Sequence, residues 1–205
     1  MARRIGETSY KETAFGIIPR SKLIPLEIEG IQRAWDFVLQ ERQADLIAVT
    51  PTLLKRVHEI GFGWIFPEFG GKFRRIDVQV SKYQPPKFPR VPELMADFCD
   101  DLTERMRHIP SIESAIFLDQ LIELLAWAHH KFLWIHPFQD YNGRIGRLLV
   151  NIILLNFDFP PIECRVETQA RRRKYVSALQ SADGGVFVLL EEIIHEALQE
   201  AAKAV

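Results

Sequence analysis

The sequence has very little cysteine. Only Cys99 and Cys164 occur among the 205 residues, and neither lies near another cysteine in the sequence. This scarcity excludes a disulfide scaffold and a multi-cysteine zinc site, and it favours a reducing, cytoplasmic compartment. Apolar stretches of the ~20 residues that a membrane-spanning helix needs are also absent, as is an apolar signal segment near the N-terminus. We therefore expect a soluble protein with no membrane partner.

An excess of charge of either sign is missing too. Lysine and arginine number 26 against 27 aspartates and glutamates, which makes the formal net charge −1. A dedicated nucleic-acid-binding domain usually shows a basic excess, so we expect no nucleic-acid partner. The chain carries no internal repeat, and its hydrophobic content of 47% is sufficient for a folded core.

Hydrophobic periodicity predicts an all-α protein with one small β-hairpin. Residues 1–49 are predicted as an N-terminal arm that becomes helical from Ile31, and residues 50–205 as the main domain. Thr50-Pro51 marks a helix start, and further helices are expected over residues 93–107, 116–135, 143–156, 168–181 and 186–202. The only clear strand pattern is the alternation of Ile76, Val78 and Val80 with polar residues.

Polar residues are concentrated between the two most apolar helices, where residues 136–147 read HPFQDYNGRIGR. The start of the second helix offers free backbone N–H groups and the positive end of the helix dipole, which together favour an anion. Asn142 is the expected N-cap of this helix. Arg144 and Arg147 lie one turn apart, so both guanidiniums are expected to reach successive phosphates.

Three further residues of this loop suggest chemistry or support. Asp140 is a hard oxygen ligand suited to Mg²⁺ that also contacts phosphates. His136 stands at the loop entrance as a candidate general base, and Phe138 is expected to pack into the core. Together the loop residues predict a phosphoryl-type transfer site. A polar helix connection with a structural histidine is the simpler alternative, and the number of matching groups disfavours it.

The loop resembles the Fic family signature, H-x-F-x-[D/E]-G-N-G-R-x-x-R, at every fixed position except Tyr141. The segment Gly71-Lys72-Phe73-Arg74, with the strand after it, resembles the flap hairpin that docks a target segment in this family. The resemblance covers residues 50–205 and implies a Fic-like helical bundle. It further implies Mg²⁺-dependent transfer of AMP from ATP to a Ser, Thr or Tyr hydroxyl of a target protein.

The resemblance also implies a role for each motif residue. His136 would be the catalytic base, Asp140 would hold the metal, and the ATP-binding residues would be Asn142, Gly143, Arg144 and Arg147. Tyr141 stands where the family usually has glycine, which leaves two interpretations open: an ordinary backbone, or a side chain that narrows the pocket. The second would favour a nucleotide-binding or toxin module with an altered donor or without transferase activity.

A shorter resemblance concerns regulation. Glu29-Gly30 matches the end of the inhibitory motif [S/T]-x-x-x-E-[G/N] of the family, although Pro25 replaces the expected Ser or Thr. This match predicts that Glu29 pairs with Arg147 and inhibits the enzyme. The alternative is that Glu29 lies in the first turn of the helix that includes Ile31. If Glu29 does not reach Arg147, a separate inhibitor or antitoxin chain is expected, and an oligomer is also conceivable.

Overall fold

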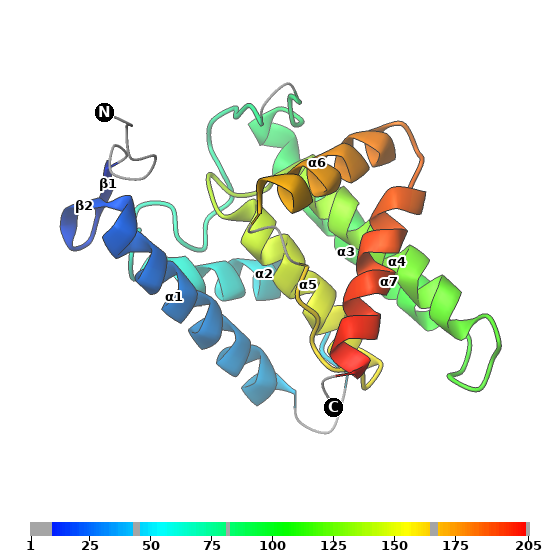
Figure 1. The fold of residues 1–205 in the computed structure, drawn as a ribbon. Helices are drawn as coiled ribbons and strands as arrows, with labels where there is room; N and C mark the ends of the chain where they lie inside the picture. The colour runs from blue at the N-terminus through cyan, green and yellow to red at the C-terminus, as the bar shows by residue number, and fades with distance from the viewer. Residues whose placement is uncertain (1–9, 43–45, 81–82, 165–167, 204–205) are drawn as a thin grey trace.

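The computed structural model describes residues 10–42, 46–80, 83–164 and 168–203. This part of the chain is mainly helical, which confirms the predicted fold class (Figure 1). The helices are α1 (Arg20–Glu41), α2 (Pro51–His58), α3 (Val91–Arg107), α4 (Phe117–Ile135), α5 (Asn142–Asn156), α6 (Gln169–Asp183) and α7 (Val188–Ala202). Two short segments, the π-helical η1 (Glu59–Gly63) and the 3₁₀ turn η2 (Phe88–Arg90), complete the helical content.

Helices α4 and α5 form the centre of the core. Helix α4 packs against α3, α5 and α7, while α5 also contacts α1 and α2 (Figure 1). Their buried side chains surround most of each helix, as expected for central helices of a bundle. The loop that joins them, residues 136–141, therefore starts and ends in the best-packed part of the molecule.

Helix α1 lies across η1, and two glycines set the distance between them. A Cβ added to Gly30 would lie 2.0 Å from the carbonyl oxygen of Gly61, so the two backbones are in direct contact. The helix begins at Arg20, eleven residues before the predicted start at Ile31. Its buried face includes Leu23, Glu27, Gly30, Ala34 and Val38. The charged residue Glu27 within this face interrupts the apolar periodicity. For this reason the sequence pattern did not predict the first turns of α1.

The β-hairpin lies at a different place from the predicted one. Strands β1 (Tyr10–Thr13) and β2 (Gly16–Pro19) pair antiparallel just before α1, within the predicted arm, whose residues 1–9 lie outside the described residues. The prediction of a strand at residues 76–80 is wrong, because this segment is irregular apart from an isolated bridge between Val80 and Tyr83. Asp77 instead accepts hydrogen bonds from the Phe88 amide and the Lys87 ammonium, which hold the segment away from extended pairing.

Within the described residues, no helix is both long enough and apolar enough to cross a membrane.

Candidate functional site

The loop between α4 and α5 contains two residues in the left-handed region. His136 ends α4 with φ 51° and ψ 60°, and Tyr141 precedes α5 with φ 64° and ψ 10°. Both are non-glycine residues in a region that side chains disfavour, so surrounding contacts must hold them there. The first interpretation of Tyr141, an ordinary backbone, is therefore excluded. The two turns reverse the chain and present the start of α5 beside the end of α4.

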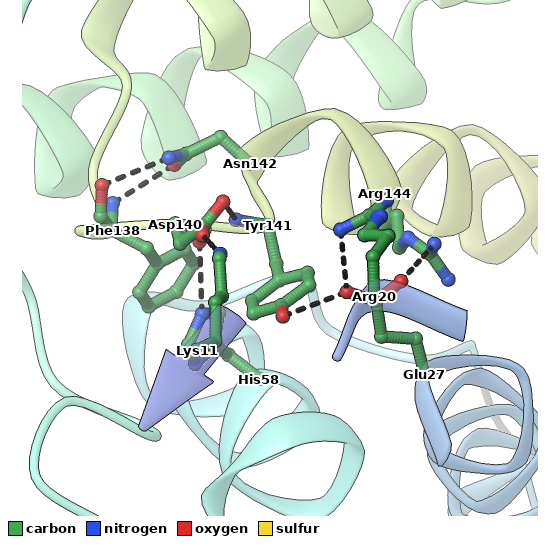
Figure 2. Close-up of polar contacts among 9 residues, drawn as sticks. All are labelled: Lys11, Arg20, Glu27, His58, Phe138, Asp140, Tyr141, Asn142 and Arg144. Carbon is green, nitrogen blue, oxygen red and sulfur yellow. Dashed lines mark hydrogen bonds and ion pairs between the residues drawn. The ribbon is translucent and has the colours of Figure 1, made fainter. Parts of the chain in front are cut away.

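Asn142 stabilises the loop in a different way from the predicted N-cap. Tyr141 occupies the cap position, and Asn142 is the first residue of α5. The Asn142 side chain reaches back to Phe138, accepting from its amide at 2.9 Å and donating to its carbonyl at 2.8 Å (Figure 2). Phe138 is fully buried, as predicted. The start of α5 remains open, because the Gly143 amide has no hydrogen-bond partner among the described residues.

The six predicted motif residues converge on one cavity of about 260 Å³, lined in part by His136, Asp140, Asn142, Gly143, Arg144 and Arg147. A neighbouring cavity of about 620 Å³ shares His136, Gly143 and Arg147, and its walls include Tyr83, Trp134 and Tyr175. A polar cavity at a helix start beside a larger aromatic one matches the size and chemistry of small-molecule sites.

The His136 imidazole has the tautomer that a general base needs. Its Nδ1 lies 3.3 Å from the Leu133 carbonyl, which only accepts, so Nδ1 carries the proton. The lone pair is then left on Nε2. Burial lowers the pKa of His136 below its ordinary value, and the nearby Arg74 guanidinium lowers it further, so the ring is neutral at pH 7.

Arg74 supports the loop from the predicted flap segment. Its buried guanidinium donates to the carbonyls of His136 at 2.8 Å and Ile76 at 3.1 Å, and also to that of Pro86. Its backbone amide donates to Pro137 at 2.9 Å. The Arg74 side chain is thus not on the surface where target docking was predicted. It instead holds the left-handed turn at His136.

His58 is a residue of this site that the sequence analysis missed. Its Nδ1 accepts from the Gly71 amide at 3.0 Å, so Nε2 carries the proton and donates to the Asp140 carbonyl at 3.2 Å. The ring stacks on Phe138 with centroids 4.0 Å apart. Burial lowers the pKa of His58 to about 4, which keeps the ring neutral. His58 therefore joins the flap segment to the loop, but one polar residue on an amphipathic helix gives no signal of this role.

Glu27 places a fully buried carboxylate in the cavity. Its Oε2 accepts from Arg144 at 2.6 Å, and its Oε1 accepts from the Tyr141 hydroxyl at 2.9 Å and from Arg20 at 3.2 Å (Figure 2). Burial and this carboxylate both raise the pKa of Tyr141 above its ordinary value. Two guanidiniums and one hydroxyl together compensate the buried charge.

The predicted contact between Glu29 and Arg147 is corrected by the structure. Glu29 pairs with Arg33 at 2.6 Å on the outer side of α1, and its side chain is 48% exposed. Glu27 shares a helix face with Gly30, which packs against η1, whereas Glu29 lies two residues further and points away. The carboxylate that engages the motif is therefore Glu27, and its partner is Arg144.

Asp140 is also engaged from the N-terminal segment. Its Oδ1 accepts from the Tyr141 amide at 2.7 Å, and its Oδ2 accepts from the Lys11 ammonium of β1 (Figure 2). The Lys11 ammonium also lies 5.3 Å from the centroid of the Tyr141 ring. No cluster of three or more His, Cys, Asp or Glu suited to a metal occurs among the described residues. The Asp140 carboxylate thus already has a cation beside it.

Tyr141 contributes more to packing than to narrowing the cavity. Its ring stacks on Phe62 with centroids 4.0 Å apart, and only 7% of the residue is exposed. We expect Tyr141→Phe to keep this stack but lower the free energy of unfolding by about 1–3 kcal/mol, because a hydrogen bond to a buried charged group is lost. Urea denaturation of both proteins measures the difference. Equal stability would show that the hydroxyl contributes nothing to holding Glu27.

The geometry defines a helical domain with a polar cavity at the start of α5, between its two central helices. The model of the Fic/DOC family matches residues 48–154, so the chain belongs to the Fic/DOC family. Among curated proteins it is similar to the protein adenylyltransferase fic-1 of Caenorhabditis briggsae, with 37% identity over 162 residues. That alignment covers 78% of this chain and 29% of the relative, so the chain spans less than a third of its length.

Solved structures show the same fold. Fic-1 of C. elegans (aa134 - 508) superposes with a TM-score of 0.68 and 28% identity, covering 87% of this chain and 51% of that one. BepC of Bartonella tribocorum, solved with bound AMPPNP, reaches a TM-score of 0.71 at 16% identity and covers 95% and 94% of the two chains. The likeness to BepC concerns the fold alone.

Proposed function

We propose that this protein is a protein adenylyltransferase that transfers AMP from ATP to a Ser, Thr or Tyr hydroxyl of a target protein. The observation that carries the proposal is the convergence of all six motif residues on one cavity, with the free Nε2 of His136 among them. The adenylyltransferase named among the relatives supports the same reaction.

We assign a residue to each step of this reaction. Nε2 of His136 accepts the proton of the target hydroxyl, whose oxygen then bonds to the α-phosphorus of ATP. The bond from that phosphorus to the bridging oxygen breaks, and pyrophosphate leaves. Asn142 and the Gly143 amide lie at the helix start that would stabilise the negative charge, while Arg144 and Arg147 would hold the β- and γ-phosphates.

The residues present also fit a Mg²⁺ ion. Asp140 Oδ2 faces a cation, the ammonium of Lys11, which shows that this position favours positive charge. Magnesium at nucleotide sites is usually held by one or two carboxylates together with substrate phosphates, so a lone carboxylate is sufficient. When bound, the ion would neutralise charge on the phosphates. The protein's part is to fix Asp140, through the Tyr141 amide and the His58 ring.

The target protein would approach over the segment Gly71-Lys72-Phe73. Lys72 is exposed, and Phe73 forms a bridge with Phe138 that ties the segment to the catalytic loop. The buried Arg74 anchors the base of this segment. A docked target strand would thus be held in a fixed position relative to His136. Transfer needs such a position, because the target hydroxyl must be brought to the α-phosphorus.

The arrangement corresponds to a self-inhibited state of the enzyme. Glu27 occupies the guanidinium of Arg144, which is assigned here to the β-phosphate, so the nucleotide and the carboxylate compete for the same donor. Tyr141 does not explain a loss of activity, since its ring packs on Phe62. We therefore favour an inhibited transferase over a binding module that has lost the reaction.

Mass spectrometry tests the proposal directly. The protein and candidate targets from a lysate are incubated with Mg²⁺ and, separately, with ATP, GTP, CTP or UTP, using both the natural protein and Glu27→Gln. We expect the mass of one adenylyl group to be added to a hydroxyl residue with ATP. An added mass with another nucleotide would identify a different donor, and binding of ATP without any modified protein in either sample would support the binding module.

The pH dependence of transfer follows from His136. Burial lowers its pKa, so the neutral form that accepts a proton persists as the pH falls to the ordinary value of about 6.5 and is lost only below it. We expect the transfer rate to be level between about pH 7 and 8 and to fall on the acid side with a midpoint below about 6.5. A rate profile whose acid midpoint lies above 7 would contradict the assignment of this base.

A further inference from the structure

The N-terminal hairpin brings an ammonium group to the carboxylate that is assigned to the metal. Side chains in β1 alternate, with Tyr10 and Glu12 exposed and Lys11 directed toward the loop. Lys11 pairs with Ile18 of β2 in the hairpin register. The Lys11 ammonium contacts Asp140 Oδ2, although the two residues lie 129 positions apart in the sequence (Figure 2).

The position at Oδ2 is the one that a metal would need. Oδ1 of Asp140 already accepts a hydrogen bond from the Tyr141 amide, which belongs to the loop itself. Oδ2 is the oxygen that contacts Lys11 of the hairpin, and Lys11 and Asp140 both line the cavity beside His136 and Arg144. A divalent ion and the Lys11 ammonium would repel one another if both contacted Oδ2. The two cations therefore cannot occupy the same side of the Asp140 carboxylate together.

We propose that Lys11 occupies the cation position at Asp140 and that Mg²⁺ enters the site only by displacing it, so the hairpin gates the metal. This inference rests on the proposed function, in which Asp140 holds the metal. Lys11 is then a second control of the site besides Glu27. Lys11 competes with the metal, whereas Glu27 competes with the phosphates of the nucleotide.

The contacts of the hairpin explain how Lys11 is held in place. The Ala14 amide, at the turn between the strands, donates to the Ile65 carbonyl at 2.9 Å, and the Phe15 ring meets the Trp64 ring edge to face at 5.8 Å. The other end of the hairpin continues directly into α1 at Arg20. The strand that carries Lys11 is thus held by the contacts of the turn and by its pairing with the other strand. The position of this backbone places the Lys11 ammonium beside Asp140.

The Lys11–Asp140 contact is also weak enough to exchange. The side chains are 38% and 43% exposed, and ion pairs between partly exposed groups are screened by solvent. A doubly charged ion that also bonds the phosphates of ATP replaces one weak contact with several.

Nucleotide binding at controlled Mg²⁺ concentrations tests the gate without measuring transfer. Calorimetric titration of ADP into the natural protein and into Lys11→Met, at a series of Mg²⁺ concentrations, gives the Mg²⁺ concentration for half-maximal enhancement of ADP affinity. We expect Lys11→Met to lower this concentration by about two- to fivefold, the range that corresponds to a partly exposed ion pair. Lys22→Met, which removes the same charge from an exposed position of α1, should leave it unchanged.

Two further variants sharpen the result. Lys11→Arg keeps a cation at Asp140 and should require nearly as much Mg²⁺ as the natural protein, whereas Asp140→Asn should abolish the enhancement by Mg²⁺. The proposal is overturned if Lys11→Met needs as much Mg²⁺ as the natural protein or more, or if the enhancement survives in Asp140→Asn. Failure of the proposed function is a separate outcome, since it appears as no adenylyl transfer at any Mg²⁺ concentration.

Discussion

Replacement of His136 with alanine is expected to lower the rate of adenylyl transfer by about 10²–10⁴-fold, the usual contribution of a positioned general base. The reason is that His136 lines the motif cavity and that Nε2 is its basic atom, because Nδ1 donates to the Leu133 carbonyl. The rate is measured as adenylyl transfer to a modified target, in the Glu27→Gln background so that inhibition does not mask the loss.

A matched variant separates chemistry from folding in this experiment. His136 has φ 51°, a conformation that asparagine adopts more readily than most residues, so His136→Asn keeps the turn while removing the base. Affinity for ATP should be nearly unchanged in both variants, because the phosphate-binding groups belong to α5. Transfer at the unmodified rate in His136→Asn would show that another group accepts the proton.

Glu27→Gln is expected to tighten the binding of ATP and to destabilise the fold at the same time. The substitution removes the carboxylate that holds the Arg144 guanidinium at 2.6 Å, which frees it for a phosphate. We expect ATP affinity to rise by about tenfold or more, since a charge-assisted hydrogen bond of this kind contributes about 1.5–3 kcal/mol. The free energy of unfolding should fall by about 1–3 kcal/mol, because the Arg20 and Arg144 guanidiniums lose hydrogen bonds to a charged partner.

The chain offers a close control for this prediction. Glu29→Gln, two residues further along α1, removes a charge whose partner is Arg33 on an exposed face. It should change neither ATP affinity nor transfer, and it should alter stability by less than about 0.5 kcal/mol. Calorimetry with ATP, the adenylyl-transfer assay and thermal unfolding of the three proteins give these three values. Higher affinity in Glu29→Gln than in Glu27→Gln would restore the inhibitory role to Glu29.

The position of the loop at residues 136–141 was predictable from the sequence because its information is local. The predicted burial of Phe138 depends on residues within one loop and is confirmed, whereas the N-cap is Tyr141 instead of the predicted Asn142. The two central helices were equally predictable, since they are apolar nearly all round. The predicted bounds of α4 and α5 differ from the structure by a single residue.

The N-terminal contacts were not predictable, because they join residues far apart in the sequence. Glu27 and Arg144 are separated by 117 positions, and no periodic pattern links them. The wrong prediction of a strand at residues 76–80 has a related cause. Alternating side chains form a strand only where another strand is available to pair with, and here the side chains of Arg74 and Asp77 form hydrogen bonds to other backbone groups instead. Glu29 was selected from a short motif, whereas the register of α1 on Gly61 turns Glu27 inward.

The reaction proposed for this cavity carries the α-phosphate of ATP, as part of the adenylyl group, to a protein hydroxyl. The most direct measurement compares ATP labelled at the α-phosphate with ATP labelled at the γ-phosphate, using Glu27→Gln, Mg²⁺ and a lysate as the source of targets. We expect protein-bound label from the α-labelled nucleotide alone, and none when His136 is also replaced. Label from the γ-phosphate, or no label from either position, would contradict it.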